Sequence, residues 1–352
     1  MDSLGRSLSL ALFFASSLSV VAFGASAQDA VPPRFWIVTN NGVDDTTCGT
    51  QASPCRSITR AIVNASAGDW IQVGPGRYGD LDENGFLTGV GEESGACGAA
   101  ICVNKTLNIV SREGAVRTVI DLTNVQSPRN ALIIRADDVV FGRSNRGFTV
   151  RGAPNVGVEV EGSRISIVDN IAIGNEAAGF ALQAGVPNDC HLFGNQAIDN
   201  GSGFFVVGDG HLLEFNVALS NRGAGFVLAG HGQRFYDNQS IGNGGGIDVN
   251  GGGDVRIVHN AFIGNLQQGL KVLNQTFGLA VVQNNFFGNG TRFDAANLGL
   301  LADPGPRVNA TNNFWGAATG PGPDPADQVT GDVRFVPFAT KPFTMRSLND
   351  VR

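Results

Sequence analysis

Apolar and polar positions alternate along much of the chain, and the pattern recurs at a nearly fixed spacing. Asparagines five residues apart occur in six successive pairs, and the first members are separated by 25, 21, 22, 22 and 24 residues. The pairs are Asn170/Asn175, Asn195/Asn200, Asn216/Asn221, Asn238/Asn243, Asn260/Asn265 and Asn284/Asn289. A period in this range predicts a solenoid of stacked repeats.

Each repeat contains short segments with apolar residues at alternate positions, as in Phe180/Leu182 and Ile247/Val249. Period two predicts strands with one buried face, and helical spacing is absent across the repeats. Such a unit buries its apolar face when units stack, with each strand about 4.8 Å from its copy in the next coil. Equivalent asparagines then lie above one another, and each amide can donate to the next. We therefore interpret the asparagines as structural.

The segment before the repeats has a different pattern. Ile58, Ala61, Ile62 and Ala65 have helical spacing, whereas Trp70–Val73 is strand-like. A helix at this position would cover the open apolar end of the solenoid.

Three stretches resemble one known group of proteins. The segment FWIVTNNGVDDTTCGTQASPCRSITRAIVNASAGDWIQVGPGRY, from Phe35 to Tyr78, is similar to the opening of exported proteins of the pectin-lyase-like superfamily. The middle repeats resemble the repeats of that superfamily, and NNFWGAATGPGPDPAD, from Asn312 to Asp327, resembles the segment that often closes its members. The resemblance implies an all-β fold, a single right-handed parallel β-helix solenoid with an N-terminal capping helix.

The resemblance also implies a domain organisation. We expect the β-helix to occupy residues 28–340, followed by a tail of residues 341–352. Within it we expect an N-terminal cap at 35–78, repeats at about 130–295 and a C-terminal cap at 312–340, where Phe314 and Trp315 would close the last coil.

The N-terminus is typical of a secretory signal peptide, expected at residues 1–27. Arg6 supplies a positive charge, residues 8–23 are apolar, and Ala25-Ser26-Ala27 offers a cleavage site. We therefore expect a secreted or periplasmic protein with no membrane span after cleavage; a retained membrane anchor is the alternative. The net charge of −7 argues against a nucleic-acid partner.

Five cysteines fit an exported protein. Cys48 and Cys55 enclose one short loop, and Cys97 and Cys102 enclose another, so we predict two local disulfides; free or metal-binding thiols are the alternative. Cys190 is left over and is expected to be a small buried residue.

Sites in this superfamily commonly lie on the outer face of one parallel sheet. The second and fourth residues after the glycine that leads each strand define such a strip: Glu159/Glu161, Ala181/Gln183, Phe205/Val207, Val227/Ala229, Asp248/Asn250 and Lys271/Leu273. We predict substrate contacts at Glu159, Glu161, Gln183, Phe205 and Asn250. A polysaccharide lyase needs a base and a cation that neutralises the uronate carboxylate, and the strip holds no dense cluster of this kind.

Asp248 and Lys271 are the catalytic candidates on this strip. The segment from Gly246 to Asn265 resembles the stretch of exported mannuronan C5-epimerases that carries a D-P-H-D motif. Asp248 matches the first Asp, whereas Val249, Asn250 and Gly251 replace the other three residues. The alternative is that Asp248 is simply an outward residue on a strand.

His211 and His231 are further catalytic candidates, because they precede their asparagines by five and seven residues in successive coils. With Asp209 nearby and His191 on the same edge, they would form a metal or acid/base site. Periplasmic copper-associated β-helix proteins offer an analogy; a coincidence of polar loops is the alternative.

The segment Asp80-Leu81-Asp82-Glu83-Asn84-Gly85 matches the first half of a calcium loop, D-x-D-x-N-G, with Asp80, Asp82 and Asn84 as oxygen ligands. The twelfth position is Gly91, and Glu92 comes one place late. This excludes a helical calcium hand and leaves an isolated calcium loop or a solvated acidic loop.

Two classes of function remain. The first is an exported β-helix protein that binds an extracellular polysaccharide, and in the enzymatic case modifies it as a lyase, hydrolase or epimerase. The second is a non-catalytic envelope or surface β-helix used for adhesion or partner binding. We favour polysaccharide recognition, with calcium as the one cofactor suggested and no oligomeric state defined.

Overall fold

The computed structural model describes residues 32–347 except residues 96, 128, 184–186, 274–275 and 291–296. The predicted signal peptide therefore lies outside the described residues. Residues 33–352 form one compact unit. Within its described part, strands and turns dominate and one helix occurs, α1 (Ile58–Asn64). No helix of the described residues is long and apolar enough to cross a membrane.

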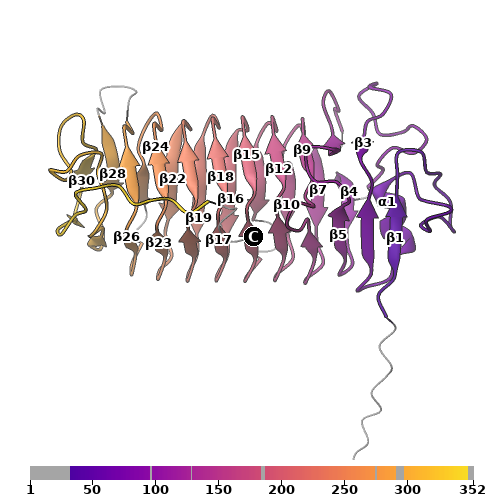
Figure 1. Cartoon of the computed structure of the whole chain (residues 1–352), viewed down its shortest axis with the longest axis horizontal. Coiled ribbons are helices and arrows are strands. Elements are labelled where there is room, and N and C mark those ends of the chain that lie inside the picture. The colour runs from indigo at the N-terminus through magenta and orange to yellow at the C-terminus, as the bar shows by residue number, and fades with distance from the viewer. Residues whose placement is uncertain are drawn as a thin grey trace, which may run out of the picture. The chain divides into compact units, whose positions relative to one another are not determined.

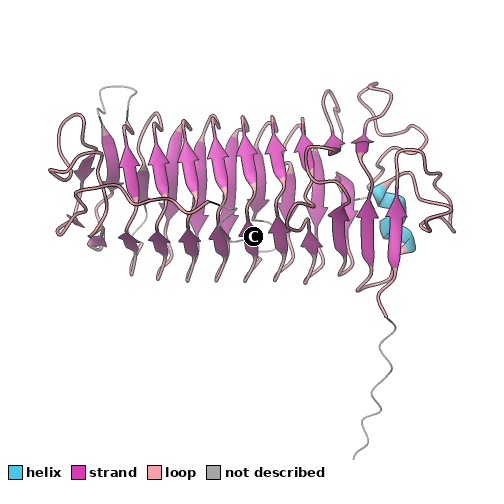
Figure 2. Ribbon diagram, viewed as in Figure 1, coloured by secondary structure: helices cyan, strands magenta, loops and turns pink. Residues whose placement is uncertain are grey.

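Three parallel sheets form the walls of the solenoid, and each of the middle coils contributes one strand to each sheet (Figures 1 and 2). The twelve-stranded sheet contains β1 (Phe35–Val38), β2 (Trp70–Val73), β5 (Asn108–Ser111), β8 (Val140–Phe141), β11 (Ser166–Val168), β14 (His191–Phe193), β17 (Leu212–Glu214), β20 (Arg234–Tyr236), β23 (Arg256–Val258), β26 (Ala280–Val282), β29 (Val308–Asn309) and β31 (Val333–Arg334).

The other two sheets complete each coil. The ten-stranded sheet contains β4 (Ala99–Val103), β7 (Asn130–Ile134), β10 (Val158–Val160), β13 (Ala178–Leu182), β16 (Ser202–Val207), β19 (Ala224–Ala229), β22 (Gly245–Asn250), β25 (Leu270–Leu273), β28 (Leu298–Ala302) and β30 (Gln328–Thr330). The nine-stranded sheet contains β3 (Gly76–Gly79), β6 (Thr118–Asp121), β9 (Thr149–Arg151), β12 (Ile171–Ile173), β15 (Gln196–Ile198), β18 (Val217–Leu219), β21 (Gln239–Ile241), β24 (Ala261–Ile263) and β27 (Asn285–Phe287).

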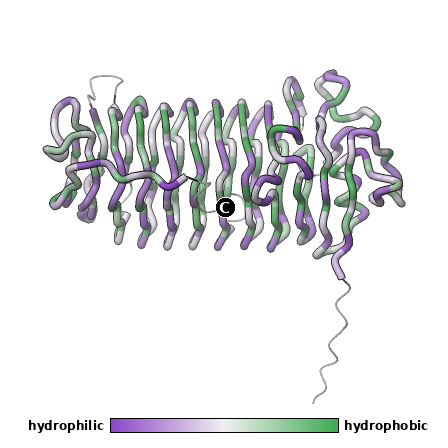
Figure 3. Tube along the Cα trace, viewed as in Figure 1, coloured by the Kyte–Doolittle hydropathy of each residue, from purple (hydrophilic) through white to green (hydrophobic). Residues whose placement is uncertain are grey.

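The core is a column of apolar side chains inside the coils, and Figure 3 shows the alternation of apolar and polar positions along each coil. Parallel register places like residues above one another, so Phe180, Phe204 and Phe226 stack with ring centroids 4.9 and 4.7 Å apart. Near the end of this column, Trp315 is fully buried and stacks on Phe286 with ring centroids 4.5 Å apart.

The two asparagine positions form two ladders along the solenoid, as predicted. In the middle of the first ladder, Asn216 Nδ2 donates to Asn238 Oδ1 at 3.0 Å and to the Leu192 carbonyl at 2.8 Å. Its Oδ1 accepts from both the backbone N–H and Nδ2 of Asn195, each at 3.0 Å. The ladder asparagines are thereby paired from coil to coil, which avoids the cost of unsatisfied polar groups.

The helix predicted near residue 60 is α1, and Figure 1 shows it at the same end of the stack as β1. The Ser57 hydroxyl accepts from the Arg60 N–H at 3.1 Å as the N-cap. Asp44 accepts from the backbone N–H groups of Arg56 and Ser57, and the buried carboxylate of Glu93 accepts from Ile58 N–H at 2.7 Å.

The C-terminal segment runs back along the corner between the twelve- and nine-stranded sheets, and is drawn in yellow across the front of Figure 1. Ala339 N–H donates to the Asn313 carbonyl at 2.9 Å, and Phe343 N–H donates to Asn285 Oδ1 at 2.9 Å. Further along, the guanidinium of Arg346 pairs with Asp237. The expected tail at 341–352 therefore packs on the coils as far as residue 347, and residues 348–352 lie outside the described part.

Candidate functional site

The outer face of the twelve-stranded sheet carries a concentration of polar and aromatic side chains over four adjacent strands. The pleat turns the first and third residue of each strand outward while the middle residue is buried. Parallel register aligns these outward residues from coil to coil. They are His191/Phe193 on β14, Leu212/Glu214 on β17, Arg234/Tyr236 on β20 and Arg256/Val258 on β23.

A cleft of about 560 Å³ opens on this face. It is lined by Leu212, Glu214, Gly232, Arg234, Tyr236, Asp254 and Arg256. Arg234 and Arg256 are exposed neighbours in register, and neither guanidinium forms an ion pair or hydrogen bond within the described residues. Glu214 instead pairs with His191 Nε2 at 3.1 Å. Two adjacent cations are thus available to an anionic ligand, although the whole chain is acidic.

A second cavity of about 350 Å³ lies beside the cleft, and Tyr236 lines both. Here the fully buried carboxylate of Asp237 is hydrogen-bonded to Nδ1 of His259 and paired with Arg346. Asp237 and His259 occupy the same corner position in successive coils, with φ of 55° and 61°, which places one directly above the other. A neutral imidazole that donates Nδ1–H to this carboxylate presents the lone pair of Nε2 for acid/base chemistry.

Sequence reasoning did not single out His259. A signal was nevertheless present, because Asp237 and His259 both stand immediately before the first asparagine of their repeats, Asn238 and Asn260. In a solenoid the same offset in adjacent repeats means spatial contact, and an acid followed by a histidine at that offset predicts a pair.

The strip predicted on the ten-stranded sheet does face outward, and its acidic end is a compact cluster. Burial raises the pKa of Glu159 and the neighbouring Glu161 adds to this rise, whereas a hydrogen bond from Gln183 opposes it. Asn130 Nδ2 donates to the Glu159 carboxylate, and Arg135 pairs with Glu161 at 2.8 Å. These carboxylates therefore already have partners within the protein.

The apolar middle of the strip is partly covered. Ala181 is fully buried in a small cluster with Val156 and Ala178, and the half-buried Phe205 packs against this cluster. These side chains therefore form a small local core outside the sheet.

At the far end of the strip, Asp248 and Lys271 are neighbours in register, and Asn250 is exposed. Burial raises the pKa of Asp248, whereas Lys271 and a hydrogen bond from Gln268 at 3.2 Å lower it. These two catalytic candidates are thus brought together.

The expected histidine site does not form. His211 is fully buried: its Nδ1 accepts from the Cys190 N–H at 3.1 Å, and its Nε2 lies 3.3 Å from the Val207 carbonyl. Burial lowers its pKa, and it occupies the corner position taken by Gln233 in the next coil. His231 is exposed, and Asp209 accepts from its backbone N–H. The prediction was wrong because the offset from the asparagines differs by two residues, which puts one imidazole inside and the other outside.

The cysteine predictions are confirmed. Cys48–Cys55 and Cys97–Cys102 are disulfides with Cα atoms 4.9 and 6.0 Å apart, and Cys190 is a free buried cysteine. Burial raises the pKa of the Cys190 thiol to about 11. A thiol in this state is a poor nucleophile at neutral pH.

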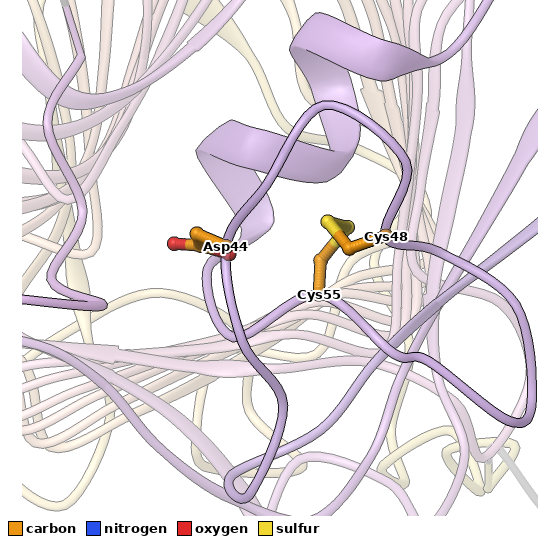
Figure 4. Close-up of side chains that lie close together, drawn as sticks. All are labelled: Asp44, Cys48 and Cys55. Carbon is orange, nitrogen blue, oxygen red and sulfur yellow. A yellow bond between two sulfur atoms is a disulfide. The ribbon is translucent and has the colours of Figure 1, made fainter.

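Two groups of three side chains in the described part of the chain have the spacing of metal ligands. The first is Asp44, Cys48 and Cys55. Figure 4 shows its two sulfur atoms joined to each other, so they do not ligate a metal. The second is Asp80, Asp82 and Glu92. Asn84, the third ligand expected from the sequence, donates to Asp82 at 3.0 Å through Nδ2.

Comparison with known protein families gives a match for this chain. A family model described as periplasmic copper-binding protein (NosD) matches residues 103–299, which is more than half of the chain. The chain belongs to this family. The NosD family is periplasmic, in agreement with the expected export. No curated protein matches the chain.

Solved structures similar to this NosD-family chain include a pectate lyase, Pel9A, with a TM-score of 0.59 and 17% identity over 88% of this chain and 78% of that chain. A rhamnogalacturonan lyase has a TM-score of 0.52 and 13% identity over 88% of this chain and 87% of that chain. At these identities the similarity shows the fold alone, and it confirms the right-handed parallel β-helix.

The family description mentions copper, but the described side chains do not fit a copper centre. Copper favours imidazole, thiolate and thioether ligands. Neither group with metal-ligand spacing contains a histidine, and the sulfur atoms of one are tied up in a disulfide. The histidines are dispersed, since His191 pairs with Glu214, His259 pairs with Asp237, and His211 is enclosed in the core.

Proposed function

We propose that this protein binds an anionic polysaccharide outside the cytoplasm, along the outer face of its twelve-stranded sheet. One observation carries the proposal: Arg234 and Arg256 are exposed neighbours on one face and have no partner among the described residues. The proposal is also supported by the similar fold of a pectate lyase and a rhamnogalacturonan lyase.

The chemistry of the cleft suits acidic sugars. A guanidinium group is a planar fork that binds a carboxylate through two parallel hydrogen bonds. Strands in adjacent coils are about 4.8 Å apart, so both arginines can reach one carboxylate or two on successive sugars. Tyr236 lies on the same strand as Arg234 and offers an aromatic face with a polar hydroxyl to a sugar ring.

The cavity beside the cleft supplies groups for a reaction on the bound sugar. A neutral His259 whose Nδ1 donates to Asp237 presents Nε2 as a proton acceptor, and Tyr236 lines both this cavity and the cleft that holds the arginines. We therefore place acid/base chemistry, where it occurs, at His259 rather than at the buried His211.

Binding of polygalacturonate and alginate to the mature protein, measured by calorimetry, tests the proposal. Replacing both arginines, R234Q/R256Q, should weaken binding at least about tenfold, because two charge-assisted contacts are lost. Lys271→Gln is the matched control, since it removes one exposed-face cation from the ten-stranded sheet. Unchanged binding in the double variant, or an equal loss in Lys271→Gln, would contradict the assignment of the face.

Absorbance at about 235 nm on the same acidic glycans separates binding from lyase chemistry, because it reports unsaturated uronate products. A rising signal that disappears in His259→Gln supports catalysis at the dyad. A flat signal with intact binding supports recognition alone. A protein that binds none of the glycans supports the second class of function, a surface β-helix that binds a partner.

A further inference from the structure

The loop between β3 and β4 gathers three carboxylates far from the cleft in sequence. Asp80 directly follows β3, Asp82 lies two residues on, and Glu92 returns from the other side of the loop. One oxygen of each carboxylate lies within 4.8 Å of the corresponding oxygens of the other two. The cluster therefore joins the two ends of the loop.

Two of these three carboxylates are buried. Asp80 is 0% exposed and Glu92 is 4% exposed, whereas Asp82 is exposed. Asp80 Oδ2 accepts from the Gly85 N–H at 2.8 Å, but Oδ1 is buried and has no hydrogen-bond partner. A buried carboxylate oxygen without a partner is costly, and its presence inside an acidic cluster points to a missing cation.

The described residues form no ion pair with the three carboxylates. Arg77 pairs with Glu83 and with Asp121, at 3.0 Å for the latter, and these are different carboxylates. Glu92 is held by backbone N–H groups, from Leu81 at 2.8 Å and Gly89 at 2.6 Å. Backbone donors position the carboxylate but carry no full positive charge, so the two buried carboxylates lie side by side without an ion-pair partner among the described residues.

We propose that Asp80, Asp82 and Glu92 form a calcium site. The ligands are all carboxylate oxygens, which hard divalent cations prefer. Calcium accepts oxygens at about 2.3–2.6 Å in flexible geometry, so two of its ligands can lie as much as about 4.8 Å apart, whereas magnesium requires a tighter octahedron. Glu92 supplies the last protein ligand of the loop, and bound water completes the coordination.

The site is independent of the proposed glycan function, because none of its residues lines the cleft or the neighbouring cavity. Its effect is structural. Calcium would hold the loop from Asp80 to Glu92 against the first coils, beside Glu93, whose carboxylate caps α1.

Thermal unfolding and calorimetry of the mature protein with calcium alone test the site. Calcium at millimolar concentration should raise the Tm by roughly 5 °C, through preferential binding to the folded state. Magnesium at the same concentration should give a much smaller rise. Asp82→Asn and Glu92→Gln should each weaken calcium binding at least about tenfold; Asp82 is exposed, so its variant should fold normally.

Glu83→Gln is the control, because Glu83 lies in the same loop, pairs with Arg77 and is outside the cluster. It should keep the full response to calcium. In chelator, Asp82→Asn should keep the Tm of the parent protein, because Asp82 is exposed. No calcium-dependent shift in the parent protein, or a normal shift in both cluster variants, would overturn the site.

Discussion

The repeated coils and the N-terminal loops both bury polar side chains, but they satisfy them in opposite ways. In the coils, each ladder asparagine donates to one neighbour and accepts from the other, as Asn216 does with Asn238 and Asn195. In the loop after β3, Asp80 and Glu92 are buried carboxylates, and neither forms an ion pair among the described residues. A side-chain amide is both donor and acceptor, so identical amides can hydrogen-bond to one another from coil to coil. An ionised carboxylate only accepts, so it needs a donor or a cation from another group.

The same contrast holds for how the two regions are tied together. The coils gain their order from hydrogen bonds and stacked rings between identical positions. The loops have no copies to pair with, and two disulfides close them instead. Regular stacking therefore supplies its own stability, and the irregular segments depend on covalent bonds and, in our proposal, on calcium.

Breaking a ladder in its middle should give the largest effect on stability. Asn216→Ala leaves two buried donors of Asn195 without an acceptor, at about 1–3 kcal/mol each, so we expect a loss of roughly 2–6 kcal/mol in the free energy of unfolding. Chemical denaturation measures this loss. Asn41→Ala, at an exposed asparagine, is the control and should change stability little. A loss below about 1 kcal/mol at Asn216 would mean that the ladder contributes little.

The end of the second ladder should depend on pH. Asp327 accepts from Asn289 Nδ2 at 2.7 Å, and burial raises its pKa to about 6. The folded state therefore holds a proton that the unfolded state releases, and stability falls as pH rises from about 4 to 6. Asp327→Asn should remove this fall and be more stable than the parent at pH 8 by up to about 3 kcal/mol.

Denaturation of both proteins across this pH range gives the comparison. Asp332→Asn is the control, because Asp332 is exposed and pairs with Arg307. If the difference between Asp327→Asn and the parent stays constant from pH 4 to pH 8, the carboxylate does not titrate as described.

Removing the disulfide of the first loop should have a somewhat smaller effect. Cys48 and Cys55 close a short loop, and the double variant C48A/C55A should lose about 2–3 kcal/mol, since the unfolded chain regains freedom. Thermal unfolding, with the reduced parent protein as a second reference, measures this. A reduced parent as stable as the oxidised one would show that packing alone holds the loop.

Much of the scaffold could be predicted because it repeats. The asparagine spacing defined the coils, and alternation defined which side chains enter the core. The spacing of Ile58, Ala61 and Ile62 located α1, and short separations located the disulfides. These features depend on neighbours in sequence or on exact repetition, and both are visible in a single chain.

The site was harder to predict for a physical reason. In the ten-stranded sheet, a glycine precedes the outward residues of each repeat strand, so Asp248 and Lys271 could be located from the sequence. Strands β20 and β23 have three residues each, and no glycine directly precedes either of them. Arg234 and Arg256 become a pair through parallel register between coils. His211 shows the converse, since its position in the chain did not reveal that its imidazole turns inward.

The sequence alone determined the solenoid, its ladders, its capping helix and its disulfides, because these arise from periodic or local patterns. Tertiary structure decided which of three outer faces gathers free arginines, which histidine meets a carboxylate, and that Glu92 returns to Asp80. Those contacts depend on how far each coil turns and where each loop closes, and small differences in residue offset move a side chain from solvent to core.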